Sequence, residues 1–284
     1  MRTIRVCICI VLTALAACRA GLESKERVVL ARTHSGFLQL YVSGSRSKGE
    51  PAVIFEAGLG DPSETWRAVA TEMATSTQII RYDRAGLGRS PAAAALPSAM
   101  EIASQLHDAL VSVHIEPPYV LVSHSAGAWY ALVFAGQHPD EVKGLVLVDP
   151  TPPNFFNEIA SLQNDLERRE FTSSMARYET NASPARRAEW QSRDEAARQA
   201  EEAALPKGMP VVIITAAAPQ PGRSPAITRY WRDQHERMTR TTSNGRLVVA
   251  NSGHYVQLEQ RRIVVREIRQ LLTALRGRTT QGSR

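Results

Sequence analysis

Cysteine is nearly absent from this chain of 284 residues. The three cysteines, Cys7, Cys9 and Cys18, all lie within the first 18 positions. If residues 1–17 are removed during export, only Cys18 remains, and no disulfide can form within the mature chain. The sequence also contains no cluster of metal-ligating side chains and no cofactor-binding fingerprint, so we expect neither a metal nor a cofactor.

The sequence also lacks a run of Lys and Arg interleaved with aromatic residues, which is the pattern of a nucleic-acid-binding surface. The formal net charge is +6, and leaving out Arg2 and Arg5 of the N-terminal segment gives 32 basic residues against 28 acidic ones. The glycine-rich stretch 83–90 lacks the Gly-Lys-Ser/Thr ending and the spacing of a phosphate-binding P-loop. We therefore expect no nucleic-acid partner and no bound nucleotide.

The N-terminus has the pattern of an export signal. Arg2 and Arg5 precede an apolar stretch, residues 6–17, that is too short to span a bilayer. The small residues directly before Cys18 resemble the lipobox of bacterial lipoproteins. This resemblance implies lipidation of Cys18 and a place in the bacterial cell envelope, on the periplasmic side. The alternative is an ordinary signal peptide cut near Ala17, which would leave Cys18 as a free thiol.

The order of strand and helix patterns indicates the fold class. Apolar strand patterns alternate with helix patterns, which predicts an α/β fold with a mostly parallel sheet covered by helices on both faces. The predicted strands follow a hairpin over 27–42 and lie at 52–55, 78–82, from Tyr119, and at 144–148, 210–214 and 246–250. At this length, with 43% hydrophobic residues, one sizeable core is sufficient.

Residues 151–207 differ in composition from the rest of the chain. They are charged and rich in helix-forming residues, and they separate two predicted strands. We interpret them as a helical cap over the carboxyl ends of the sheet, inserted into a core formed by residues 27–150 and 208–276. The alternative is a solvated excursion without a role. The sequence says nothing about the oligomeric state.

A strand that turns directly into a helix around Ser125 is the most informative motif. The strand starts at Tyr119, and the small residues Ser123 and Gly127 lie two positions before and two after Ser125. This is the pattern of a nucleophile elbow, in which a tight turn exposes the serine hydroxyl above the first turn of a helix. Small neighbours are needed because larger side chains would collide with adjacent strands. We therefore predict that Ser125 is a catalytic nucleophile.

A serine nucleophile needs a general base, and His254 is the best candidate. His254 follows the last predicted strand, which places it at the carboxyl edge of the sheet, the edge where Ser125 lies. The other histidines fit less well. His124, for example, directly precedes the nucleophile and is expected to point away from it.

Together these motifs resemble the α/β-hydrolase superfamily, from about Pro51 to the last helix. The resemblance rests on the Ser125 elbow, on residues 252–254 around His254, and on two loops, 57–60 and 82–90. It implies the α/β-hydrolase fold. It also implies that the backbone N–H groups of Leu59 and Ala126 form the oxyanion hole.

The base of a serine hydrolase is oriented by an acidic residue, the third member of a catalytic triad. In this sequence that acid does not stand at the position that is common in the superfamily. Many relatives carry an Asp or Glu after the strand that here ends near Thr215, but residues 216–222 contain none. Asp233 and Glu236 come later, in a predicted helix, and fit poorly. Some relatives use the end of the preceding strand, where Asp149 stands, so Asp149 is our candidate. The alternative is that Asp149 only caps a turn.

These residues predict a serine hydrolase that cleaves an ester or related acyl bond through an acyl-enzyme intermediate. The same triad could instead act on a lactone, an amide or a carbon–carbon bond. A hydrolase-fold protein that binds a small ligand without turnover is a further alternative, favoured by the missing acid after Thr215.

Overall fold

The structure is a computed structural model that describes residues 26–92, 97–219 and 223–281. The predicted signal peptide, residues 1–17, and the predicted lipidation site Cys18 lie outside the described residues. Within the described part of the chain, no helix has both the length and the apolar composition needed to cross a membrane.

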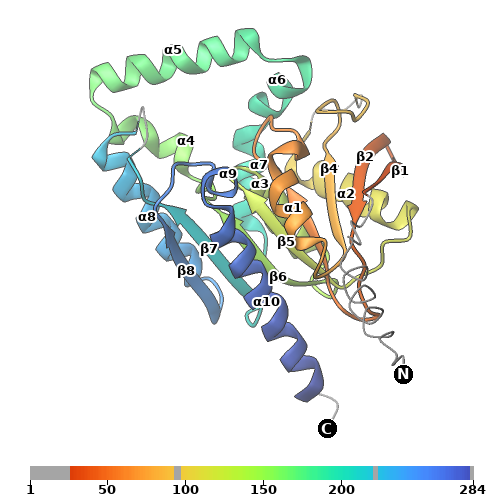
Figure 1. Cartoon of the computed structure of the whole chain (residues 1–284). Helices are drawn as coiled ribbons and strands as arrows, with labels where there is room; N and C mark the ends of the chain where they lie inside the picture. The colour runs from red at the N-terminus through yellow and green to blue at the C-terminus, as the bar shows by residue number, and fades with distance from the viewer. Residues whose placement is uncertain (1–25, 93–96, 220–222, 282–284) are drawn as a thin grey trace, which may run out of the picture.

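The described residues form an eight-stranded sheet in the order β1-β2-β4-β3-β5-β6-β7-β8 (Figure 1). The N-terminal hairpin is antiparallel, and β2 also pairs with β4 in antiparallel fashion, whereas the strands from β4 to β8 are parallel. The strand bounds are β1 Arg27–Thr33, β2 Gly36–Ser43, β3 Ala52–Glu56, β4 Ile79–Asp83, β5 Tyr119–His124, β6 Val142–Val148, β7 Pro210–Ala216 and β8 Asn244–Ala250. The predicted α/β fold with a mostly parallel sheet is confirmed.

The central strands are apolar on both faces because helices cover both. In β3, Ile54 packs into the core on one face, whereas Val53 and Phe55 pack into the core on the other, as the two-residue period of a strand requires. The first face is covered by α2 (Ala99–Ser112) and α3 (Gly127–Gln137). The second is covered by α1 (Arg67–Met73), which follows the 3₁₀ turn η2 (Ser63–Trp66), and by α10 (Arg261–Gln281).

A helical segment connects β6 to β7 and lies beyond the carboxyl ends of the strands (Figure 1). It contains α4 (Phe155–Glu158), the 3₁₀ turn η3 (Ile159–Leu162), α5 (Asp165–Asn181) and α6 (Pro184–Gln191). The long helix α5 buries none of its residues, and Figure 1 shows it apart from the sheet. We call α4 to α6 the cap.

The last helix of the segment predicted as cap belongs to the layer on the sheet. Helix α7 (Arg193–Glu202) buries Ala196, Ala197 and Ala200 in the same apolar cluster as α2 and α3. These small side chains share one helix face and allow close packing. The charged residues of α7, which suggested a cap from the sequence, cover only its outer face. After β7 the chain continues through α8 (Pro225–Thr239) and, beyond β8, α9 (Val256–Glu259).

Candidate active site

Ser125 stands at the turn between β5 and α3 in a left-handed backbone conformation, with φ of 54°. This conformation costs a residue other than glycine about 1–2 kcal/mol, so the surrounding contacts must hold it. One such contact is the hydrogen bond of 3.0 Å that the Ser125 N–H donates to the carbonyl of Val148. A Cβ at Gly127 would lie 2.3 Å from the carbonyl oxygen of Ala57, so only glycine fits there. The other small residue of the elbow, Ser123, is fully buried, and its side chain is accommodated there.

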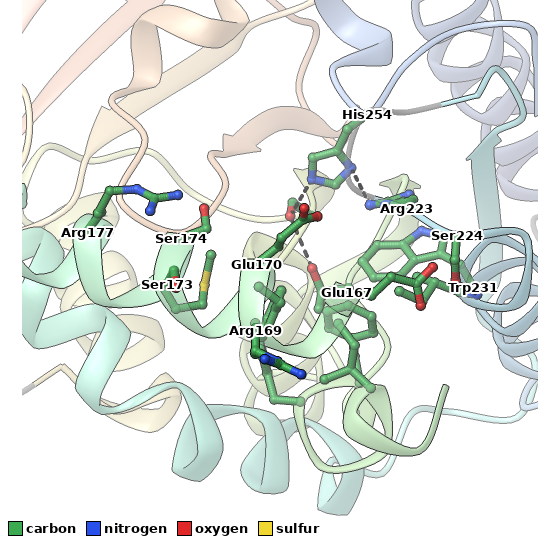
Figure 2. Close-up of a pocket in the computed structure, with 18 of the residues that line it drawn as sticks. Glu167, Arg169, Glu170, Ser173, Ser174, Arg177, Arg223, Ser224, Trp231 and His254 are labelled. Atoms are coloured by element: carbon green, nitrogen blue, oxygen red, sulfur yellow. Dashed lines mark hydrogen bonds between the residues drawn. The ribbon is translucent and has the colours of Figure 1, made fainter. Parts of the chain in front are cut away.

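The structure brings Ser125, His254 and Asp149 together. His254 Nε2 lies 2.8 Å from Ser125 Oγ, and His254 Nδ1 lies 2.6 Å from Asp149 Oδ2. Figure 2 shows His254 at the cavity. With Nδ1 protonated, the ring donates to the carboxylate and keeps Nε2 free to accept the serine proton. This is the arrangement that general-base activation of a serine requires.

Asp149 is fully buried, and both carboxylate oxygens accept hydrogen bonds. Oδ1 accepts from the N–H of Ala216 and from Trp231 Nε1, each at 3.0 Å, and Oδ2 accepts from His254. Burial alone would raise the pKa of Asp149, but the hydrogen bond from His254 and the nearby positive charge lower the pKa to about 2. The group is therefore a carboxylate at neutral pH. Asp233 and Glu236 lie exposed on α8.

Arg223 was not among the residues expected at the site. Its Nη1 lies 3.6 Å from Asp149 Oδ2, and its guanidinium is 4.0 Å from the centre of the Trp231 ring. Figure 2 shows Arg223 beside His254. The sequence around Arg223 offered no signal for this position, because its place depends on the packing of α8 against β7 and β8.

His124 does not contact Ser125 with a ring nitrogen, but it lies directly against the loop that carries His254. His124 Nε2 is 3.0 Å from the backbone oxygen of His254, and the two ring centres are 4.6 Å apart. Complete burial lowers the pKa of His124 to about 3, so the ring is neutral and its Nε2–H donates to that oxygen. His124 therefore supports the His254 loop.

The loop 57–60 lies over the nucleophile. A Cβ at Gly58 would be 3.4 Å from Ser125 Cβ and 3.0 Å from His124 Nδ1, so the backbone of the loop approaches the elbow closely. Within the described ranges, the N–H groups of Leu59 and Ala126 have no protein acceptor. Both amides are thus free to donate to a ligand beside Ser125, while their role as the oxyanion hole remains a prediction.

A cavity of about 1070 Å³ opens at Ser125 and His254 and extends under the cap. Its apolar wall comes from both the cap and α8, and it includes Phe155, Phe156, Trp190, Ile227 and Trp231. Charged side chains of α5, such as Arg169 and Glu170, also line the cavity (Figure 2). The cavity can hold a sizeable apolar group next to the nucleophile.

In the described part of the chain, one group of side chains has ligand atoms close enough to be considered for a metal ion. It consists of His107 within α2, His138 directly after α3, and Glu141 directly before β6. The two imidazole rings are stacked in parallel, 4.0 Å apart with an angle of 4°. Nitrogen lone pairs lie in the plane of the ring, so parallel rings direct them side by side and not at one ion. This stacked arrangement is unfavourable for binding one ion between the two rings.

Comparisons with known proteins agree with this fold. The model of the family described as "Alpha/beta hydrolase family" matches residues 53–267. The protein YqjL of Bacillus subtilis (strain 168) is 37% identical over 98 residues, which cover 34% of this chain and 39% of YqjL. The chain therefore aligns with about two fifths of the length of this relative.

Two solved structures share the fold at low sequence identity. A thermophilic esterase from Thermogutta terrifontis is 18% identical with a TM-score of 0.59, and the match covers 88% of this chain and 99% of the esterase. The enol-lactonase from Burkholderia xenovorans LB400 is 14% identical with a TM-score of 0.56, over 87% of this chain and 100% of the lactonase.

Proposed function

Because this chain belongs to the alpha/beta hydrolase family, we propose that it is a serine hydrolase that cleaves an ester or related acyl bond. The observation that carries the proposal is the continuous contact from Asp149 through His254 to Ser125, with distances of 2.6 and 2.8 Å. The sequence left open a protein that binds without turnover, because no acid follows Thr215. That argument loses its basis, since Asp149 supplies a carboxylate to His254 from the end of β6.

The geometry supports a two-step reaction. The Ser125 oxygen attacks the carbonyl carbon while His254 Nε2 takes the hydroxyl proton, and the carbonyl oxygen becomes an oxyanion at the N–H groups of Leu59 and Ala126. Asp149 stabilises the resulting imidazolium. His254 then gives its proton to the leaving alcohol, which departs and leaves an acyl ester on Ser125. Water, activated by His254, hydrolyses this ester and restores the serine.

The cavity favours a substrate with a sizeable apolar group. Aromatic side chains from α4, α6 and α8 surround the space next to the nucleophile, and burial of each substrate methylene against them contributes about 0.8 kcal/mol. The same triad can open a lactone, which is an internal ester, and the enol-lactonase shows that its fold accommodates that reaction in another protein. Ester and lactone substrates therefore belong in one assay series.

The test is hydrolysis of chromogenic esters of increasing acyl chain length. We expect wild-type turnover that rises with chain length until the cavity is filled, and a loss of at least about 1000-fold in Ser125→Ala. Ser174→Ala is the matched control, because Ser174 also lines the cavity but lies on the cap helix α5. Unchanged ester turnover in Ser125→Ala would show that the serine is not the nucleophile.

For the cellular location we propose export to the bacterial cell envelope and anchoring through lipid on Cys18. The support is the charged and apolar pattern of residues 1–17 and the small residues before Cys18. Two or more acyl chains anchor a protein stably, whereas one chain is marginal. Cys18→Ser should therefore release the protein from the membrane fraction or leave it unprocessed. A wild-type mature chain without lipid mass would contradict the proposal.

A further inference from the structure

The cap helix α6 contacts both sides of a single residue in the loop over the nucleophile. The Gly60 N–H donates to Glu189 Oε2 at 2.6 Å, and the Gly60 carbonyl accepts from Arg186 Nε at 2.8 Å. Gly60 has a left-handed backbone with φ of 71°, and a Cβ there would lie 2.5 Å from the hydroxyl oxygen of Tyr178 on α5. The cap thus covers Gly60 closely and holds its two backbone polar groups.

Glu189 also reaches the other end of the same loop through Arg84. Its carboxylate accepts from Arg84 Nε at 2.6 Å and from Arg84 Nη2 at 2.9 Å, a bidentate pair. Arg84 in turn donates to the carbonyls of Ala57, at 2.8 Å, and Gly58, at 2.6 Å. With a further bond of 2.6 Å to Glu56, all five N–H donors of the guanidinium have acceptors.

The bond to the Gly58 carbonyl has a geometric consequence for the predicted oxyanion hole. In a planar trans peptide, the carbonyl of one residue and the N–H of the next point in opposite directions. When Arg84 holds the Gly58 carbonyl, it therefore turns the Leu59 N–H to the opposite side of the loop. Glu189 and Arg186 hold the next residue, Gly60, so the Leu59 peptide is fixed from both sides.

The charged groups of this cluster are buried, and one guanidinium faces two carboxyl groups. The side chains of Arg84, Glu56 and Glu189 are each about 97% buried or more. One guanidinium cannot neutralise two carboxylates in the dry interior. Burial raises the pKa of Glu56 to about 7, against the opposing effect of Arg84, while Glu189 is the carboxylate that Arg84 contacts with two nitrogens.

We propose that Glu189 is a positioning residue for the oxyanion hole, and that through it the cap helix α6 sets the orientation of the Leu59 N–H. Glu189 is not among the residues that line the cavity, and its hydrogen-bond partners, Arg84 and Gly60, lie outside the triad. It acts through Arg84 on the Gly58 carbonyl and directly on the Gly60 N–H. Displacement of α6 from the loop then lowers the rate of the chemical step even though Ser125, His254 and Asp149 remain in place. This inference rests on the proposed function.

Glu189→Gln tests the proposal, because the amide keeps the size of the side chain but replaces one acceptor oxygen by an NH₂ donor, so it cannot keep all three bonds from Arg84 Nε, Arg84 Nη2 and the Gly60 N–H. We expect kcat to fall about 10- to 100-fold, less than the loss of an entire oxyanion donor, with KM changed by less than about 3-fold. The inhibition constant of an alkylboronic acid, which forms a tetrahedral adduct on serine, should rise by the same factor as kcat falls. Glu195→Gln on α7 is the control, since Glu195 is an exposed glutamate paired with Arg198, and it should match wild type.

The rates are referred to sites titrated with a fluorophosphonate, so that loss of folded protein is not mistaken for loss of rate. A wild-type kcat per titrated site in Glu189→Gln would overturn the proposal, and so would equal weakening of boronic acid and substrate binding. If Glu189→Gln does not fold, Glu189→Asp replaces it, because the shorter side chain keeps the charge but cannot reach Arg84 and the Gly60 N–H together, and unchanged kcat there has the same meaning. Absence of turnover in the wild type would instead overturn the proposed function, and this inference with it.

Discussion

Thr151 Oγ1 lies 3.1 Å from Ser125 Oγ, so the nucleophile has two hydrogen-bond neighbours, the imidazole of His254 and the hydroxyl of Thr151. Ser125 has one hydroxyl proton, and transfer to His254 requires that this proton face Nε2. Thr151 then donates its own proton to Ser125 Oγ. Thr151→Val removes this donor and preserves the shape. Since one neutral hydrogen bond contributes about 0.5–1.5 kcal/mol, we expect kcat/KM to fall about 2- to 10-fold.

The backbone contacts of Thr151 should survive the substitution, because its N–H donates to the Ser125 carbonyl and its own carbonyl accepts from Trp129. The melting temperature of Thr151→Val is therefore expected to stay near the wild-type value. A rise in kcat/KM would mean that Thr151 competes with His254 for the serine proton.

Asp149→Asn tests the acid of the triad. The neutral amide favours the wrong imidazole tautomer and no longer stabilises the imidazolium, so turnover should fall by up to about 10,000-fold. Asp233→Asn and Glu236→Gln, on the exposed face of α8, should retain wild-type turnover. If either of these exposed residues proved to be the sensitive position, the assignment of Asp149 would have to be abandoned.

Acid stability gives an independent view of Asp149. Its folded-state pKa is lowered to about 2 from an ordinary value of 3.8, so the ionised carboxylate stabilises the native state above about pH 4. This contribution, about 2 kcal/mol, should be lost as pH falls from about 4 to about 2. Chemical unfolding at several pH values should show a shallower decline in Asp149→Asn than in wild type over this range. Parallel curves would contradict the lowered pKa.

The two small residues of the elbow should respond in opposite ways to alanine. Ser123 is fully buried, and within the described ranges its hydroxyl has no partner, so Ser123→Ala should raise the free energy of unfolding by about 1 kcal/mol. Gly127→Ala would place a methyl group 2.3 Å from the Ala57 carbonyl oxygen. It should lower the free energy of unfolding by about 1–3 kcal/mol and reduce turnover. Urea unfolding of both variants measures these free energies. A change of the same sign in Ser123→Ala and Gly127→Ala would contradict the account of the elbow.

Much of the fold could be predicted because its strands are short apolar runs with a clear period. Strand β5 and the turn at Ser125 are one continuous local pattern, and the sheet order follows from strands that alternate with helices. Helix α7, which falls inside the predicted cap, packs on α2 and α3 through a stripe of alanines that its charged outer face concealed in the sequence.

The site was only partly accessible from the sequence. The edge of the sheet where Ser125, Asp149 and His254 lie could be predicted, since each follows a parallel strand. The contacts of Thr151 and Arg223 could not, because they depend on how separate elements pack. The pair of Arg84 and Glu189 joins residues 105 positions apart, and no local pattern marks it.

The most direct test of the central claim is the site of covalent modification by a fluorophosphonate, read by mass spectrometry of the intact protein and its peptides. The probe reacts with a serine activated by its general base, and the 2.8 Å contact from Ser125 Oγ to His254 Nε2 supplies that activation. The account predicts one adduct per chain, on Ser125, in wild-type protein, and no adduct in Ser125→Ala. An adduct on another residue, or an unlabelled wild-type protein that still hydrolyses esters, would contradict it.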